Sequence, residues 1–201
     1  MIYMLASNNP KKLEEMKRIL LPLGIDVTTP KLAGFEVGEI EETGETFEEN
    51  AEIKAAAVCK ITGAPSIADD SGLMVDALDG RPGVYSARYG GEDKTYEQKI
   101  NMLLLEMMNS GSQNREAHFV CAICCMYPDG HKIIVKGTSD GTIGYAPRGS
   151  GGFGYDPIFF TDGNKTFAEL SDTQKDAVSH RGRALRLLVE KLREESHNKN
   201  E

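Results

Sequence analysis

The chain has 201 residues, of which 40% are hydrophobic and 27% are charged, with 21 glycines and 8 prolines. This composition is typical of a globular protein, and it excludes a disordered, collagen-like or coiled-coil chain. The 31 acidic residues outnumber the 23 basic ones, so the formal net charge is −8. An acidic chain is a poor ligand for the nucleic-acid backbone or for an anionic membrane, although a local group of cations can still bind a small anion.

The excess negative charge lies in one segment of the chain. Eight glutamates and no lysine or arginine occur between Glu36 and Glu52, and the rest of the sequence is balanced. One interpretation is a solvated acidic loop that leads into a helix. The other is a metal site, because hard divalent cations bind carboxylate oxygens.

Neither a cleaved signal peptide nor a membrane span fits the sequence, because the longest apolar run extends only from Phe119 to Tyr127. We expect a cytoplasmic protein with buried, reduced thiols, and a redox or zinc centre is the alternative. The four cysteines are Cys59, Cys121, Cys124 and Cys125.

The first half of the chain predicts a strand over 2–6, a polar turn and a helix over 11–20 that begins after Pro10. Thr46 and Glu49 have the spacing of a capping box, so we expect a second helix over 50–61 that stops at Gly63. A short buried strand over 65–68 then ends in the polar sequence Asp69-Asp70-Ser71-Gly72.

The second half predicts a helix over 95–109, opened by Thr95 and Gln98, and a hairpin of strands 117–127 and 132–138. Further strands are expected over 142–146 and 157–161, and helices over 171–179 and 181–195. Strands and helices alternate without a repeat or a linker. We therefore predict an α/β fold in one bilobed domain, residues 1–196, with a frayed tail at 197–201.

Two polar clusters in the first half are candidates for function. The start of the first helix combines free N–H groups, a partial positive charge and lysines, which suits phosphate binding, although an ordinary helix cap gives the same pattern. Its residues are Ser7, Asn8, Asn9, Pro10, Lys11 and Lys12. Two adjacent carboxylates on extended chain face opposite ways, so one of Asp69 and Asp70 is expected to point into a site and the other to stabilise a turn. Magnesium coordination with activation of a water explains such a pair, and an Asx turn closed by Gly72 is the structural alternative.

Two further clusters lie in the second half. The glycine-rich loop contains a G-x-G-x-x-G pattern at 149–154 but is followed by Pro157, so a dinucleotide-binding fold is excluded. The loop displays Phe153, Gly154, Tyr155 and Asp156, whose residue types stack on a base and bond its edge. Lys175, His180 and Arg181 supply hydrogen-bond donors for carbonyl or phosphate oxygens at a helix boundary.

In this order the clusters resemble the inosine/xanthosine triphosphate pyrophosphatase family, from Met4 to about Leu192. The shared motifs are Ser7-x-Asn9-x-x-Lys12, Glu41-Glu42-Thr43-Gly44, Glu49-Asn50-Ala51-x-x-Lys54, Ala68-Asp69-Asp70-Ser71-Gly72, Pro82-Gly83-Val84-Tyr85-Ser86-Ala87-Arg88, Gly152-Phe153-Gly154-Tyr155-Asp156-Pro157 and Ser179-His180-Arg181-Gly182. One departure is Ser7-Asn8-Asn9, where the family commonly has Thr-Gly-Asn.

The resemblance implies a long curved mixed sheet flanked by helices, a substrate cleft between two lobes, and a homodimer. It also implies Mg²⁺-dependent cleavage of ITP, dITP and XTP to the nucleoside monophosphate and pyrophosphate. By position, Glu41 and Asp70 would hold the metal and Asp70 would be the general base. Ser7 to Lys12 would bind phosphates, and the nucleotide would contact Ser71, the loop 153–156, Lys175, His180 and Arg181.

Physical chemistry is consistent with these roles, because fixed donors favour a 6-oxo group over the 6-amino group of adenine. Two other hypotheses remain open. One is a nucleotide-binding or sensor protein without activity on the same fold, and the other is a pyrophosphatase of modified pyrimidine nucleotides.

Overall fold

The computed structural model describes residues 2–7, 9–161 and 164–198. Seven strands form one sheet in the order β2-β1-β3-β4-β5-β6-β7. β1 is parallel to β2 and β3, whereas β6 is antiparallel to β5 and β7, so the sheet is mixed. The strands are β1 (Ile2–Leu5), β2 (Asp26–Thr28), β3 (Ser66–Val75), β4 (Glu116–Met126), β5 (Lys132–Ile143), β6 (Phe159–Thr161) and β7 (Lys165–Thr166). The predicted α/β class is confirmed.

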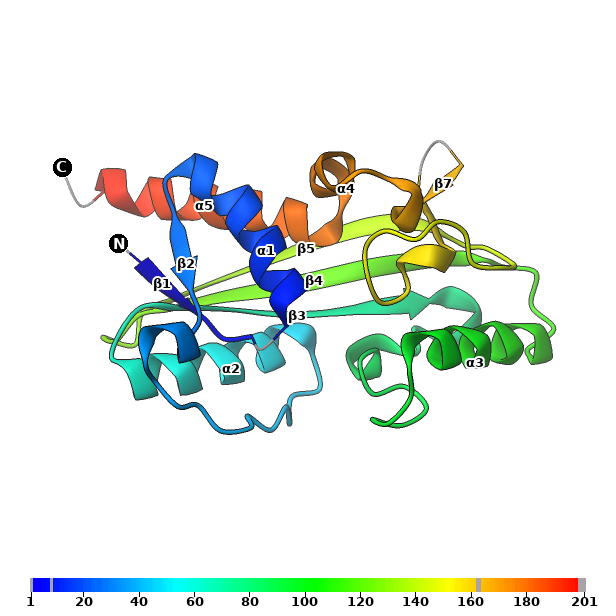
Figure 1. Ribbon diagram of the computed structural model, residues 1–201, viewed down its shortest axis with the longest axis horizontal. Coiled ribbons are helices and arrows are strands. Elements are labelled where there is room, and N and C mark those ends of the chain that lie inside the picture. Colours follow the sequence, from blue (N-terminus) through cyan, green and yellow to red (C-terminus); the bar gives the residue numbers. More distant parts are fainter. Residues whose placement is uncertain (1, 8, 162–163, 199–201) are drawn as a thin grey trace. The chain divides into compact units, whose positions relative to one another are not determined.

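Five α-helices accompany the sheet in the part of the chain that is described (Figure 1). They are α1 (Pro10–Leu20), α2 (Phe47–Thr62), α3 (Tyr96–Asn109), α4 (Asp172–Val178) and α5 (His180–Asn198). α5 continues through Asn198, two residues into the stretch that was predicted as a tail. Over the described residues, no helix has the length and hydropathy needed to cross a membrane.

The chain divides into two compact units. Unit 1 comprises Met1–Asp70, Cys121–Gly137 and Arg181–Glu201, and unit 2 comprises Ser71–Val120 and Thr138–His180. Each unit has its own hydrophobic core, because Leu5, Ile67 and Leu188 belong to one buried cluster and Leu73, Leu103 and Phe159 to another. β3 passes from the first unit into the second between Asp70 and Ser71.

Within unit 1, α1 and α5 pack on one face of the strands through Met16, Leu20, Leu185 and Leu188. Figure 1 shows α2 on the opposite face. This arrangement brings polar side chains from helices on both faces to β3, which is the third strand of the sheet.

Local sequence signals position the first helices. Asn9 caps α1, since its Oδ1 accepts the N–H groups of Lys11 and Lys12, and Pro10 occupies the first helical position. The predicted capping boxes of α2 and α3 are both present. α2 ends at Gly63, whose φ of 65° is a left-handed conformation that glycine adopts without strain.

The expected strand boundaries were wrong in two places. β3 does not end before Asp69, because Leu73 and Val75 continue the strand into the core of unit 2. The expected strand 132–138 continues through Gly141 to Ile143 as β5, and residues 144–146 of the expected strand 142–146 lie outside it. A Cβ at Gly141 would lie 2.2 Å from the Phe160 carbonyl oxygen, so this glycine allows β6 to approach closely and does not mark a turn.

Candidate active site

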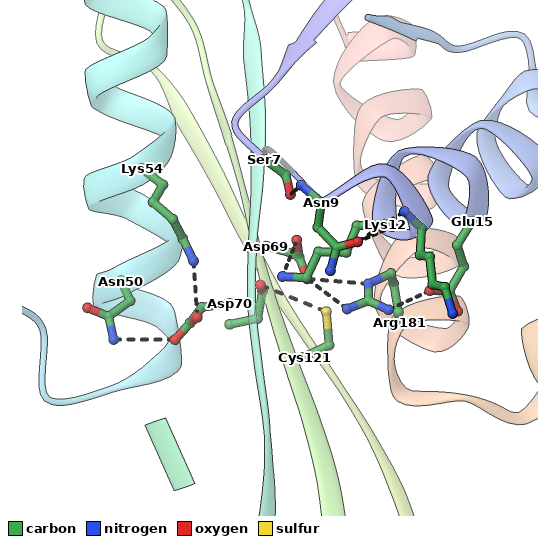
Figure 2. A network of polar contacts seen from close by, with 12 residues as sticks. Ser7, Asn9, Lys12, Glu15, Asn50, Lys54, Asp69, Asp70, Cys121 and Arg181 are labelled. Atoms are coloured by element: carbon green, nitrogen blue, oxygen red, sulfur yellow. Dashed lines mark hydrogen bonds and ion pairs between the residues drawn. The ribbon is translucent and has the colours of Figure 1, made fainter. Parts of the chain in front are cut away.

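Asp69 and Asp70 lie inside β3, and their side chains point to opposite faces of the strand (Figure 2). Side chains alternate along extended chain, so consecutive residues meet different neighbours. The predicted opposite orientation is therefore confirmed. The Asx turn is excluded because both residues lie within β3, and each carboxylate binds a cationic side chain.

Asp69 binds two cations on the α1 and α5 face. The Lys12 Nζ lies 2.9 Å from Asp69 Oδ2 and 3.0 Å from Oδ1, and the Arg181 Nη2 lies 3.0 Å from Oδ2. Burial by itself raises the pKa of a carboxyl group, but here the charges of Lys12 and Arg181 outweigh it and hold the pKa of Asp69 far below its usual range. Asp69 is therefore a permanently ionised, structural carboxylate.

Arg181 is the largest of the fully buried side chains, with 1% of its surface exposed. Besides Asp69 it binds Glu15, at 2.5 Å between Nη1 and Oε2. The sequence predicted Arg181 as a nucleotide contact, but the structure places its guanidinium between these two buried carboxylates. Sequence reasoning missed Glu15, because an acidic residue on an amphipathic surface helix normally faces solvent.

Asp70 faces α2 on the other side of β3 (Figure 2). Its Oδ1 lies 3.0 Å from the Lys54 Nζ, and its Oδ2 accepts the Asn50 Nδ2–H at 3.3 Å. Burial raises the pKa of Asp70, the Lys54 ammonium lowers it and the charge of Glu42 raises it, with a net shift above the usual value. A carboxylate with a raised pKa binds a proton more readily than a free one.

Lys54 links Asp70 to the acidic segment. Its ammonium lies 2.9 Å from Glu42 Oε1, so one cation is shared by Glu42 and Asp70. Burial lowers the pKa of Lys54, but the charges of Asp70, Asp69 and Glu42 outweigh it and raise the pKa above its ordinary value. The point between Glu42 and Asp70 thus already attracts a positive charge.

The predicted metal ligand Glu41 is exposed, whereas its neighbour Glu42 shares the Lys54 ammonium with Asp70. Two carboxylates that converge on one cation are the hard oxygen donors that Mg²⁺ prefers, so the residues present fit this metal. Within the described ranges no group of three His, Cys, Asp or Glu side chains forms a complete cage. Mg²⁺ typically keeps several waters and substrate oxygens as ligands, so two protein carboxylates are sufficient for a Mg²⁺ site.

Three other glutamates of the acidic segment stabilise α2. Glu48 pairs with Lys136 at 2.6 Å, Glu52 pairs with Lys132, and Glu49 completes the capping box. The interpretation as a helix start therefore holds for these residues, and Glu42 is the member that reaches Asp70 through Lys54.

The turn before α1 contains the predicted phosphate-binding residues. Ser7 Oγ accepts the Asn9 N–H at 3.2 Å, and Pro10 and Lys11 are exposed at the start of the helix. Lys12 connects this turn to Asp69. Asn8 lies outside the described residues.

In unit 2 the glycine-rich loop is organised by Asp156. Its Oδ2 accepts the Phe153 N–H at 2.8 Å and lies 2.7 Å from the Lys175 Nζ, whose ammonium also sits 4.6 Å from the centre of the Phe153 ring. Gly152 is required, because a Cβ there would lie 2.1 Å from Asp156 Oδ2. The structure thus brings together three of the predicted base-binding residues, Phe153, Asp156 and Lys175.

The other predicted residues of unit 2 have different surroundings. Tyr155 is buried in the hydrophobic core of unit 2, and its hydroxyl donates to the Ser86 carbonyl at 3.0 Å. His180 is buried and stacks on Phe119 with 4.7 Å between ring centroids. Ser71 is half-buried on β3, directly after Asp70.

All four cysteines are buried and free of disulfides. Burial raises the pKa of Cys124 and of Cys125 to about 12, so these thiols are protonated and unreactive at neutral pH. The prediction of buried thiols is confirmed.

Comparison with known proteins places the chain among nucleotide pyrophosphatases. The model of the Ham1 family matches residues 3–191. A dITP/XTP pyrophosphatase of Exiguobacterium sp. is 51% identical over 92% of this chain and 93% of its own, and one of Bacillus subtilis is 48% identical over 94% and 95%. A HAM1 protein structure from Coxiella burnetii superposes with a TM-score of 0.89 at 42% identity, covering 96% of this chain and 99% of that one.

Proposed function

Since the chain belongs to the Ham1 family, we propose that it hydrolyses dITP, XTP and ITP to the nucleoside monophosphate and pyrophosphate with the help of Mg²⁺. The chain is a hydrolase of phosphoric anhydrides, as the names of its relatives state for those proteins. The observation that carries the assignment of residues is the contrast between Asp69, which is fully buried against Lys12 and Arg181, and Asp70, whose side chain keeps 10% of its surface exposed beside Lys54.

Asp70 is the general base in this proposal. It is the member of the pair that keeps some solvent exposure and an affinity for a proton, so it can accept one from the attacking water. Asp69 has neither property, because it is buried and bound to Lys12 and Arg181. Lys54 and Asn50 orient the Asp70 carboxylate from α2.

Asp70 and Glu42 would hold the metal, in place of the expected pair of Asp70 and Glu41. When bound, Mg²⁺ supplies charge neutralisation on the phosphates and lowers the pKa of a bound water. Glu42 is the better candidate because it already shares a cation with Asp70 through Lys54.

The phosphates are assigned to the start of α1. Lys12, Lys54 and the N–H groups of this helix start supply the positive charge that a leaving pyrophosphate needs. Ser7 and Asn9 shape the turn through the Asn9 N–H to Ser7 Oγ bond and the Asn9 cap. Displacement at phosphorus depends mainly on such positioning and charge compensation.

The base is assigned to the loop 153–156 with Lys175 and His180. The Lys175 ammonium is a donor that cannot become an acceptor, so it favours the 6-oxo group of hypoxanthine or xanthine over the 6-amino group of adenine. Sites built on such hydrogen bonds discriminate by roughly 10⁴-fold. In this proposal Arg181 does not contact the base. It stabilises the Asp69 carboxylate, because its guanidinium binds Asp69 and Glu15.

Release of pyrophosphate from ITP, dITP, XTP and the four standard triphosphates, each with and without Mg²⁺, tests this function. We expect the three non-canonical purine nucleotides to be hydrolysed far faster than ATP, and only with the metal. Equal rates for ITP and ATP would refute the specificity. A panel without turnover would favour the sensor hypothesis, and turnover of modified pyrimidine nucleotides alone would favour the second enzyme hypothesis.

We also propose that the enzyme acts in the cytoplasm as a homodimer. The four buried free thiols suit a reducing compartment, and the dimer is an expectation from the family. Light scattering of the purified protein measures the oligomeric state, and a monomer would contradict the dimer.

A further inference from the structure

The buried ion pairs around Asp69 suggest that Lys12 changes partners during the reaction. We propose that Asp69 holds the Lys12 ammonium in the substrate-free protein, and that Arg181, anchored by Glu15, keeps Asp69 compensated when Lys12 turns to the phosphates. The inference rests on the proposed phosphate-binding role of Lys12. It makes Arg181 and Glu15 positioning residues that act through Asp69.

Exposure distinguishes Lys12 from the other three members of the network. The Lys12 side chain is 19% exposed, whereas those of Asp69, Arg181 and Glu15 are 0%, 1% and 5% exposed. Lys12 also lies in the first turn of α1 and carries its charge on a flexible four-carbon chain. Lys12 is therefore the member that can move without rearrangement of the core.

The hydrogen bonds of Asp69 allow this exchange. Arg181 donates to Asp69 Oδ2 from Nη2 at 3.0 Å and from Nε at 3.3 Å, while its Nη1 is bound to Glu15. Lys12 contacts both Asp69 oxygens. When Lys12 leaves, Oδ2 keeps two guanidinium donors, so a buried carboxylate is not left without a partner.

The charges also favour the return of Lys12. Lys12 and Arg181 both contact Asp69, so its carboxylate loses one of these two cations when Lys12 leaves. The ionised Asp69 attracts the ammonium again once pyrophosphate has left. Asp69 thus competes with the phosphates for Lys12, and Glu15 strengthens that competition.

The direct test follows the ¹⁵N–¹H signal of the Lys12 ammonium, assigned through its loss in the Lys12→Arg variant. We expect saturation of the enzyme with pyrophosphate and Mg²⁺ to shift this signal. An unchanged signal, while pyrophosphate binding is confirmed by calorimetry, overturns the exchange. The KM for ITP of Lys12→Met separates the two proposals, because an unchanged KM refutes the phosphate role itself, whereas a raised KM with an unchanged signal refutes the exchange alone.

A second test uses Glu15→Gln, with Glu14→Gln as a matched control at an adjacent exposed position. Without the charge of Glu15, Arg181 compensates Asp69 more fully and Lys12 is released more easily. We expect the Kd for pyrophosphate to fall about threefold relative to the control. This is the effect on Kd that one partly screened charge interaction has. An equal or higher Kd in a folded Glu15→Gln protein overturns the role of Glu15, and a purely structural role would change the melting temperature alone.

Discussion

Asp69 and Asp70 are consecutive residues of β3, yet each binds a lysine from a different helix: Lys12 of α1 on one face and Lys54 of α2 on the other (Figure 2). The pKa of Asp69 is held down and that of Asp70 is raised. One strand therefore presents two carboxylates with opposite pKa shifts, and the proposed function makes Asp70 the reactive one.

Replacing Asp70 with Asn tests the reactive member. The amide keeps the shape of the side chain but cannot accept a proton, so we expect kcat to fall by on the order of 10²–10⁴. The melting temperature should fall less than in Asp69→Asn, because Lys54 keeps Glu42 as a partner. Steady-state kinetics and calorimetry measure these quantities, and turnover at the wild-type rate would place the base elsewhere.

Replacing Asp69 with Asn tests the structural member. The change removes the carboxylate that Lys12 and Arg181 share, although Arg181 keeps its contact with Glu15. Loss of one partner of a buried ion pair costs about 3–5 kcal/mol. Urea denaturation measures the free energy of unfolding. The exposed Asp93→Asn is the control, because its pairing with Lys94 contributes about 0–1 kcal/mol. Equal stability of the two variants would contradict a structural role for Asp69.

The two neighbouring glutamates provide a matched pair for the metal site. We expect Glu42→Gln to raise the Mg²⁺ concentration for half-maximal activity by about tenfold, the scale of a lost ligand or its support. Glu41→Gln should leave it within about twofold, because this side chain is exposed. Titration of pyrophosphate release with Mg²⁺ gives both values. The opposite ranking would restore Glu41 as the ligand.

His118 of β4 gives unit 2 a pH-dependent stability. The hydrogen bond to Asp140, together with the charge of Asp76, outweighs burial and raises the pKa of His118. The stabilisation is therefore complete below the unfolded pKa of about 6.5 and is lost as pH rises through the folded pKa. Urea denaturation should show His118→Gln less stable than wild type at about pH 5.5 and closer to it at about pH 8.5. A difference that grows with pH would reverse the sign of this argument.

The cysteine thiols should not react with maleimide in the folded enzyme. Because all four cysteines are buried, we expect a maleimide to label none of them at neutral pH within minutes, and all of them after unfolding in denaturant. Mass spectrometry counts the labels. Rapid labelling of the native protein at Cys124 or Cys125 would revive the redox hypothesis.

The sequence was sufficient where the determinants are local. The Thr46–Glu49 and Thr95–Gln98 boxes place two helix starts, and the alternation of extended chain separates Asp69 from Asp70. Strands of three and two residues, β2 and β7, carry too little periodicity to be recognised.

Contacts between residues that lie far apart along the chain could not be predicted from the sequence. Arg181 lies 112 residues from Asp69 along the chain, so its burial between carboxylates follows only from the packing of α5. The contact of Glu42 with Lys54 depends on the direction of one side chain ahead of α2, which composition and spacing do not predict. Tyr155 also has the residue type of a base-stacking side chain, but its bond to the Ser86 carbonyl orients it inward.

The alternation along β3 has a consequence for comparing or engineering such enzymes. A shift of one residue in this strand would exchange the two aspartates, leaving Lys12 and Arg181 beside the residue that should react and Lys54 beside the one that should not. An insertion within β3 ahead of Asp69 that shifts the register would therefore exchange these surroundings even when both aspartates are retained. Two aligned aspartates are therefore equivalent only if the strand register places them on the same face of the sheet.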